Sequence, residues 1–224
     1  MTRKVIITGA SGMVGKGVLL ECLDHPEIDT VLALGRTPTG IKHTKLIELL
    51  VADFTDFLMV SDQLKGYDAC YFCLGVSAGG MKESDYKKIT YDYTLALGKT
   101  LFQLNPGMTF IYVSGQGTDS SEKGRMMWAR VKGKTENDLL ALGFKQAFMF
   151  RPGIIIPLRG IKSKTPGYQF FYTYLGWLFK LIKKVVPDSA NNTTQIGLAM
   201  INVTVHGYDK KIITTKDINT LAKG

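Results

Sequence analysis

The stretch "KVIITGASGMVGKGVLLECLDH" (4–25) carries the strongest structural signal in the chain. Its short, β-branched apolar run ends at Gly9 and predicts a buried strand. The segment 13–25 then places apolar residues at helical spacing. A second apolar run at 29–35 completes a βαβ unit, and such a crossover joins parallel strands.

The same alternation continues along most of the chain. Four further apolar runs predict strands: 45–53, 67–75, 107–115 and 145–153. Two segments between them, 84–104 and 124–142, have the pattern of helices. We therefore expect an α/β protein with a doubly wound parallel sheet, the Rossmann fold, in which ligands bind at the carboxyl ends of the strands.

The pattern loosens after Pro152. A loop, a helical segment at 191–207 and a short strand at 210–214 follow. With 224 residues, the chain predicts a single domain, 1–224. Within it, residues 157–207 are expected to form a small C-terminal elaboration that binds substrate or acts as a lid.

The segment 168–186 is apolar on almost every side and predicts a helix. It is long enough to consider as a membrane span, but Gly176 and three lysines argue against one. A lid or core helix is the favoured interpretation. A homodimer face or a helix at a membrane surface are the alternatives.

Composition restricts the partners and the compartment. The formal net charge of +9 fits nucleic acid, a membrane surface or anionic ligands, yet no run of lysines is interleaved with aromatics as in nucleic-acid platforms. A soluble basic surface is the simpler interpretation. Three cysteines and a short apolar N-terminal run without a cleavage site predict a reducing compartment, and we expect the cytoplasm. The scattered histidines offer no metal spacing, and Cys70 and Cys73 fall in a strand, as core residues.

The glycine loop "TGASGMVG" (8–15) lies between the first strand and first helix. Gly9 permits a tight turn, Gly12 lets the backbone approach a pyrophosphate, and Gly15 allows close packing of helix on strand. The helix N-terminus then offers N–H donors to phosphate. A structural turn is the alternative. The expected cofactor contacts here are Gly9, Ser11, Gly12, Met13, Val14 and Gly15.

The end of the second strand favours one cofactor over the other. An acidic residue there would bind a ribose 2′-hydroxyl, but the strand ends at Arg36, which can pair with a 2′-phosphate. We therefore expect NADP rather than NAD, with a solvated surface arginine as the alternative. Asp53 could accept a hydrogen bond from the adenine amine or could be a turn aspartate.

Several motifs occur in a familiar order: "YFCLG" (71–75), "YVSGQG" (112–117), "VKGKTE" (131–136) and "FRPGII" (150–155). With the glycine loop, they resemble the atypical short-chain dehydrogenases/reductases, which include NAD-dependent epimerases and dehydratases. The resemblance is narrower to the HIV Tat-interacting oxidoreductase-like group. It implies further cofactor contacts at Phe54, Leu74, Gly75, Lys132, Pro152 and Ile154.

The resemblance also implies a catalytic set. Ser114 would polarise a substrate carbonyl, and Lys132 would hold the nicotinamide ribose. The family's general acid, a tyrosine four residues before the lysine, is replaced by Trp128. An indole N–H has no useful acidity near neutral pH, so Trp128 can stack or pack but cannot supply the proton. Ser114 could be a turn residue instead, and Lys132 a surface lysine.

Other tyrosines are weak substitutes for the missing acid, since helix tyrosines usually pack: Tyr86, Tyr91, Tyr93 and Tyr112. The expected function is an NADP-dependent oxidoreductase or epimerase-like enzyme acting on a small carbonyl or alcohol. The alternative is a non-catalytic NADP-binding regulatory protein. Arg159, Lys162 and Lys164 could attract an anionic substrate, or could form a solvated basic loop.

Overall fold

The computed structural model describes residues 2–161 and 189–224. Within them, seven parallel strands form one sheet in the order β3-β2-β1-β4-β5-β6-β9. The strands are β1 (Arg3–Thr8), β2 (Ile28–Gly35), β3 (Leu46–Leu50), β4 (Ala69–Phe72), β5 (Thr109–Val113), β6 (Gln146–Arg151) and β9 (Ile212–Thr214). Because the chain reverses its direction across the sheet after β3, the switch point lies between β1 and β4, at the glycine loop.

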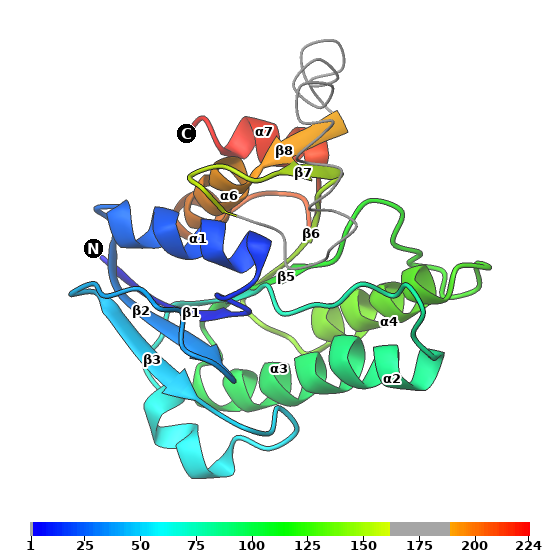
Figure 1. Ribbon diagram of the computed structural model, residues 1–224, viewed down its shortest axis with the longest axis horizontal. Coiled ribbons are helices and arrows are strands. Elements are labelled where there is room, and N and C mark those ends of the chain that lie inside the picture. The colour runs from blue at the N-terminus through cyan, green and yellow to red at the C-terminus, as the bar shows by residue number, and fades with distance from the viewer. Residues whose placement is uncertain (1, 162–188) are drawn as a thin grey trace.

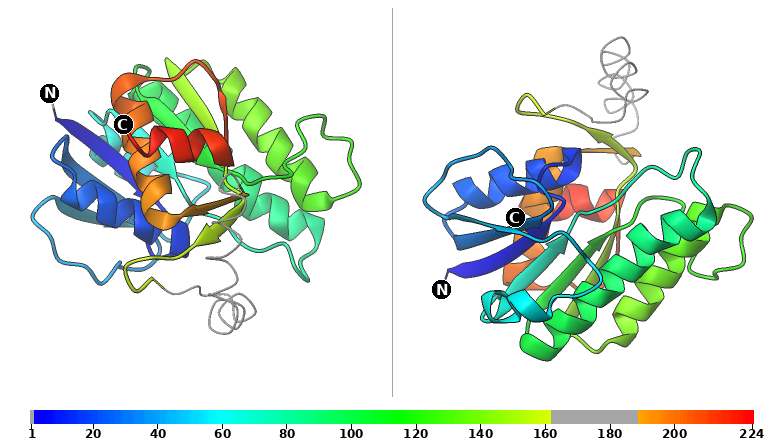
Figure 2. Two further views of the ribbon diagram at one scale, coloured as in Figure 1. Left: turned by 90° about the horizontal axis from the view of Figure 1, so that it is seen from above. Right: turned by 60° about the horizontal axis from the view of Figure 1, so that its bottom comes forward.

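Helices cover both faces of this sheet (Figures 1 and 2). One face carries α1 (Met13–Asp24), α6 (Thr193–His206) and α7 (Thr215–Leu221). The other carries α2 (Glu83–Lys87), the π-helical turn η2 (Lys88–Asp92), α3 (Tyr93–Leu104), α4 (Met127–Ala141) and the 3₁₀ helix η1 (Leu58–Leu64). The doubly wound α/β fold predicted from the alternation is confirmed.

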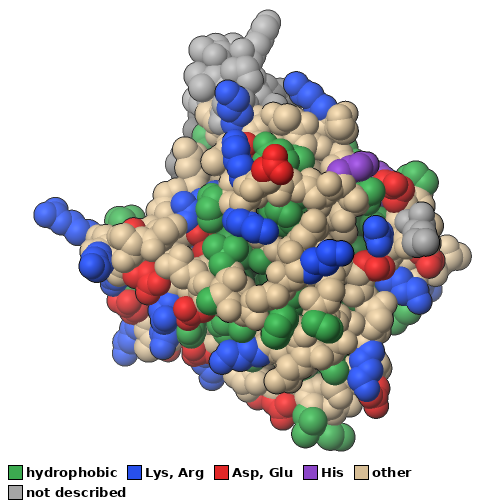
Figure 3. Space-filling model, turned by 180° about the vertical axis from the view of Figure 1, so that it is seen from behind, with side chains coloured by type: hydrophobic (Ala, Val, Ile, Leu, Met, Phe, Trp, Pro, Cys, Tyr) green, Lys and Arg blue, Asp and Glu red, His purple; other side chains and the backbone are tan. Residues whose placement is uncertain are grey.

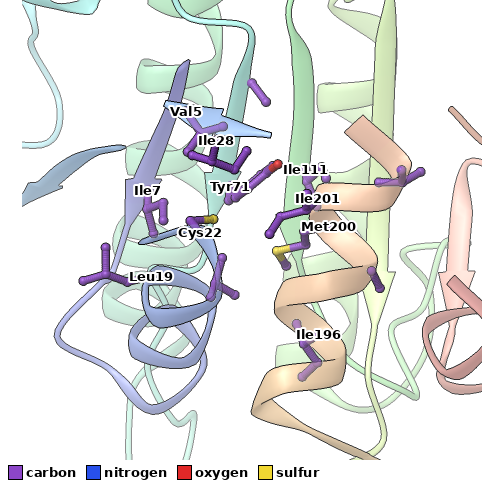
Figure 4. Close-up of a cluster of buried hydrophobic side chains, with 14 of the residues drawn as sticks. Val5, Ile7, Leu19, Cys22, Ile28, Tyr71, Ile111, Ile196, Met200 and Ile201 are labelled. Atoms are coloured by element: carbon purple, nitrogen blue, oxygen red, sulfur yellow. The ribbon is translucent and has the colours of Figure 1, made fainter. Parts of the chain in front are cut away.

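The central strands carry apolar runs because both of their faces are buried, whereas the edge strand β3 keeps only Leu49 buried. Val5 and Ile7 of β1 point toward α1 and α6, whereas Ile6 joins the cluster on the α3 side. Figure 4 shows the first of these layers, in which Leu19 and Cys22 of α1 pack against the strands and Met200 comes from α6. This alternation holds the glycine loop between two rigid layers.

Of the two cysteines predicted to be core residues in a strand, Cys70 is one, whereas Cys73 follows β4 and is partly buried. Cys70 is fully buried on the α3 side, and Cys22 is fully buried on the α1 side. Cys73 packs against the α1 layer, and burial raises the pKa of its thiol to about 12. A thiol with this pKa carries almost no thiolate near neutral pH, and the thiolate is the nucleophilic form.

Element ends differ from the prediction where local contacts override periodicity. The helix expected at 84–104 is continuous but contains the π-helical turn η2. The helix expected from 124 begins at Met127, because Asp119 Oδ2 holds the Gly124 amide in the preceding loop at 2.6 Å. The helix expected from 191 begins at Thr193, since Asn192 caps it and belongs to a strand.

Two short strands form a separate parallel pair, β7 (Ile154–Ile156) and β8 (Ala190–Asn192). Neither was predicted, and the helices η1 and α7 were also missed. The apolar segment 168–186 lies outside the described residues, as do Lys162 and Lys164. No helix in the described part of the chain has the length and hydropathy to cross a membrane.

The surface is basic without a single basic stripe on the face seen in Figure 3. There, lysine and arginine side chains are spread among acidic and apolar ones. A groove tracking a nucleic-acid backbone would instead gather positive charge along one line.

Candidate functional site: a dinucleotide pocket at the switch point

The glycine loop has the geometry of a phosphate cradle. Gly9 has φ +68°, and the Gly12 amide donates to the Gly9 carbonyl at 2.8 Å. A Cβ on Gly15 would lie 2.2 Å from the same carbonyl, so no other residue fits there. Gly12 then forms the N-cap of α1, which directs the free N–H groups of a 12-residue helix out of the loop.

Beside this loop lies a pocket of about 450 Å³. It opens between the loop and the carboxyl ends of β2 and β4, where the switch point predicts a ligand. Its walls combine backbone, hydroxyl and apolar groups with one guanidinium: Gly9, Ala10, Ser11, Ala33, Leu34, Gly35, Arg36, Thr37, Thr39, Phe54 and Leu74. The cradle and the pocket together suit the adenosine half of a dinucleotide.

The structure brings five predicted cofactor residues together around this pocket: Gly9, Ser11, Arg36, Phe54 and Leu74. Gly12, Met13, Val14 and Gly15 lie in the adjoining turn and first helical turn. The β4 end abuts the loop closely, because a Cβ on Gly9 would lie 2.7 Å from both the Cys73 carbonyl oxygen and the Leu74 amide nitrogen. Gly75, Pro152 and Ile154 lie beyond the pocket walls.

Arg36 is exposed at the pocket rim, next to the hydroxyl residues Thr37 and Thr39. Among the described residues, its guanidinium makes no ion pair or hydrogen bond with another side chain. Asp53 behaves as a turn residue, because its Oδ1 accepts hydrogen bonds from the Thr55 hydroxyl at 2.7 Å and the Thr55 amide at 2.8 Å. These bonds lower the pKa of Asp53. A contact from Asp53 to adenine stays a prediction.

Ser114 follows β5 and is only 5% exposed. Its hydroxyl donates to Glu136 Oε1 at 2.5 Å, and its other neighbour is the Phe150 carbonyl oxygen at 3.1 Å. Since a hydroxyl has one hydrogen, the bond to Glu136 leaves none for a ligand. The structure therefore directs the hydroxyl of the predicted substrate-polarising serine toward the buried Glu136 carboxylate.

Glu136 is the centre of a buried ionic cluster that the sequence reasoning missed. Its side chain is fully buried and forms an ion pair with Arg151, whose Nε lies 3.0 Å from Oε1. A buried carboxylate needs such a partner, because an unpaired buried charge is very costly. The sequence did contain a signal for this ion pair. Glu136 follows Lys132 by four residues, on the same helix face, and Arg151 ends a core strand.

Lys132 reaches from α4 to the carboxyl end of β5, where Nζ donates to the Ser114 carbonyl oxygen. A Cβ on Gly115 would lie 4.0 Å from Nζ and 4.0 Å from the Pro152 carbonyl oxygen. The amine therefore lies beside the ends of β5 and β6, where the nicotinamide half is expected. Burial lowers the pKa of Lys132 to about 8, and the nearby Glu136 carboxylate opposes this shift.

Trp128 lies one helical turn before Lys132 and packs against the loop after β5. Its Cη2 would lie 3.2 Å from a Cβ on Gly117, which has φ +88°. Among the described residues, the indole is the side chain within 4 Å of this position on Gly117. Tyr86 of α2 and Tyr112 of β5 are both buried, and burial raises the pKa of both hydroxyls.

Arg159 is not among the residues that line the pocket. Its Nη1 pairs with Glu21 at 3.1 Å and its Nη2 with Asp24 at 2.8 Å, both on α1. These two carboxylates would compete with an anionic ligand for the guanidinium, and attraction of an anionic substrate by Arg159 stays a prediction.

The glycine cradle, the sheet order and the strand-end lysine define a Rossmann-type nucleotide-binding protein of the short-chain dehydrogenase/reductase class. A family model described as the NAD dependent epimerase/dehydratase family matches residues 5–119, about half of the chain. The chain belongs to this family.

Relatives and solved structures agree with this assignment. The chain is 26% identical to Protein FMP52-2 of Scheffersomyces stipitis over 100% of this chain and 99% of that protein. It is 26% identical to Protein HTATIP2 of Rattus norvegicus over 84% of this chain and 73% of that one. The resemblance to the Tat-interacting oxidoreductase-like group is thus confirmed.

Two solved structures share the fold at low identity. An oxidoreductase of the short-chain dehydrogenase/reductase family from Burkholderia thailandensis gives a TM-score of 0.72 at 15% identity, covering 100% of this chain and 94% of that one. The enzyme WbmF of Bordetella bronchiseptica, solved in complex with NAD+, gives 0.69 at 12% identity, covering 99% and 77%.

The comparisons correct the expected compartment. The protein from Scheffersomyces stipitis and its counterparts from Emericella nidulans, Debaryomyces hansenii and Candida albicans are all named as mitochondrial. The cytoplasmic expectation was therefore wrong. It depended on the absence of a secretory signal, and that absence does not separate one reducing compartment from another.

Proposed function

We propose that the protein is an NADP-dependent oxidoreductase that acts on a small carbonyl compound or alcohol. The choice of NADP depends on one observation: the exposed guanidinium of Arg36 lies at the end of β2, on the wall of the pocket. The Thr37 and Thr39 hydroxyls stand beside it, and this wall holds no carboxylate to bind a ribose 2′-hydroxyl. A 2′-phosphate would gain charge-assisted hydrogen bonds there.

The test compares NADPH and NADH binding to the wild type and to Arg36→Ala. Removing the guanidinium should weaken NADPH binding about 10- to 100-fold, since charge-assisted hydrogen bonds are worth about 1.5–3 kcal/mol. NADH binding should change by less than about 2-fold. Arg125, an exposed arginine in the loop before α4, supplies a matched control variant, Arg125→Ala. Tighter binding of NADH than NADPH to the wild type would refute the NADP preference.

When bound, the nicotinamide supplies or accepts the hydride. The chain's own residues would then bind the phosphates at the glycine loop, orient the ribose near Lys132 and exclude water with the Trp128 side chain. Assay of NADPH consumption against a panel of aldehydes, ketones and quinones tests whether this arrangement is catalytic.

A second candidate is a non-catalytic NADP-binding regulatory protein. The inward hydroxyl of Ser114 favours it, as does Trp128 in the position of the tyrosine. Tight NADPH binding with no turnover of any carbonyl would support this candidate and reject the enzyme.

A further inference from the structure

The carboxyl end of β5 presents one ionisable side chain among the described residues that can exchange a proton near neutral pH. The Ser114 hydroxyl is committed to Glu136, and the Trp128 indole carries no acidic proton. Tyr112 of β5 is buried. The Lys132 amine, by contrast, lies beside Gly115, which has no side chain, and 4.0 Å from the position that a Cβ there would take.

We propose that Lys132 is itself the proton-transferring catalytic residue, taking the place of the missing tyrosine. This inference rests on the proposed function, since it needs a carbonyl substrate beside the nicotinamide. It differs from a lysine that only holds the ribose, because the amine must change its charge in each turnover.

The contacts of Nζ leave it free to reach a substrate. An ammonium has three hydrogens, and the contact within the described residues uses one of them, on the Ser114 carbonyl oxygen. A substrate oxygen could approach past Gly115, because this residue has no side chain and a Cβ there would lie 4.0 Å from Nζ. The Pro152 carbonyl oxygen borders the same space.

The charges facing Lys132 allow the amine to lose its proton. Glu136 is the neighbouring anion, one helical turn away, but Arg151 already pairs with it through Nε and Nη2, and Ser114 also donates to it. The carboxylate is therefore largely neutralised and does not fix the charge of the ammonium. Burial then dominates and lowers the pKa of Lys132 to about 8.

The step balances. In reduction, the substrate's carbonyl carbon gains the hydride of NADPH while its oxygen takes a proton from the Lys132 ammonium. The products are the alcohol, NADP+ and a neutral amine, which regains its proton from water. In oxidation, the neutral amine removes the proton of the alcohol. Reduction should therefore slow, and oxidation accelerate, as the pH rises through about 8.

The decisive variant is Lys132→Arg, which keeps a positive charge and N–H donors but cannot release a proton at any working pH. It should bind NADPH within about 3-fold of the wild type and lose turnover about 100-fold or more, in the range that general acid–base catalysis contributes. Lys134→Arg is the matched control, since Lys134 lies on the exposed side of α4 and pairs with Asp138. Equal turnover by Lys132→Arg and wild type would overturn the proposal.

A second readout does not depend on activity. In protein labelled with ¹³C at the lysine side chains, one lysine should titrate with a midpoint near 8, and that titration should be absent from Lys132→Arg. If every lysine titrates near the ordinary value of about 10.4, the proposal is wrong. Wild-type protein that binds NADPH without turnover also overturns it, whereas protein that fails to bind NADPH overturns the proposed function itself.

Discussion

At the scale of single residues, the candidate site contains side chains that stabilise the fold and side chains that are positioned to contact a ligand. Ser114 and Lys132 were both expected to be catalytic, yet the structure gives them opposite surroundings. The serine hydroxyl points into a buried ionic cluster, and the lysine amine lies at the strand ends. From the sequence, each residue could be either a structural or a catalytic group. The position of Glu136 separates the two cases, because its carboxylate accepts the serine's hydrogen bond.

Replacing Ser114 with Ala should therefore lower the free energy of unfolding and leave ligand binding unchanged. The change removes a donor from a buried carboxylate and should destabilise the fold by ~1–3 kcal/mol. NADPH affinity should stay the same. Urea denaturation and NADPH titration measure the two effects. A turnover loss above tenfold at unchanged stability would instead assign Ser114 to the substrate.

The stability of the fold at low pH depends on Asp217. Burial raises the pKa of Asp217, but hydrogen bonds from Lys210 and Thr214 outweigh it and lower the pKa from 3.8 to about 2. Since the folded value is the lower one, the carboxylate stabilises the fold above pH 4, and this contribution is lost as the pH falls toward 2.

Asp217→Asn should thus destabilise the protein by about 2 kcal/mol at neutral pH, and the difference from wild type should vanish near pH 2. Urea unfolding at a series of pH values measures that difference. A difference that stays constant from neutral to acid pH would show that the carboxylate's charge is not the cause.

At the scale of elements, α4 and the loop before it form one unit. The helix carries Trp128 over Gly117, and its Gly133 lies against the Asp119 carbonyl, where a Cβ would come within 1.8 Å of the oxygen. Arg130 Nη1 also donates to the Gly124 carbonyl at 2.8 Å. The loop's shape, and with it the position of the Lys132 amine, depends on this close approach.

Gly133→Ala should force the loop away from α4. The expected loss is ~1–3 kcal/mol or more, because backbone atoms cannot yield as a flexible side chain can. Gly107→Ala is the control, since a Cβ on Gly107 would meet nothing within 4 Å. Thermal unfolding of the two variants gives the comparison, and equal midpoints would contradict the packing described for Asp119.

Element periodicity also explains how much of the fold could be predicted. The βα alternation predicted every strand of the main sheet, because each contains a short apolar run, although the edge strand β3 is largely exposed. The pair β7–β8 was missed, since its second strand is the polar tripeptide Ala190–Asn192, held by pairing rather than by burial pattern. The Glu136–Arg151 pair was missed for a similar reason: it joins residues whose contact only the assembled sheet creates.

At the scale of the whole molecule, the two halves of a bound dinucleotide would meet different parts of the structure. The adenosine side has a defined pocket beside the glycine loop, with Arg36 at its rim. The nicotinamide side is expected at the ends of β5 and β6, next to Lys132. Binding energy should therefore be concentrated on the adenosine side, and fragments of the cofactor can test this division directly.

Adenosine 2′,5′-bisphosphate should stabilise the protein most among such fragments. At about 100 times its dissociation constant, a ligand contributes roughly 2.7 kcal/mol, which for a domain of this size raises the Tm by about 5–10 °C. Adenosine 5′-monophosphate, which lacks the 2′-phosphate, should give a clearly smaller shift at the same concentration, and nicotinamide mononucleotide almost none.

In Arg36→Ala the two adenosine ligands should give equal shifts in Tm, because the guanidinium is the group that distinguishes them in the wild type. An equal shift from both ligands in the wild type would mean that Arg36 is a solvated surface residue, and a larger shift from nicotinamide mononucleotide would place the main binding energy at the Lys132 end instead.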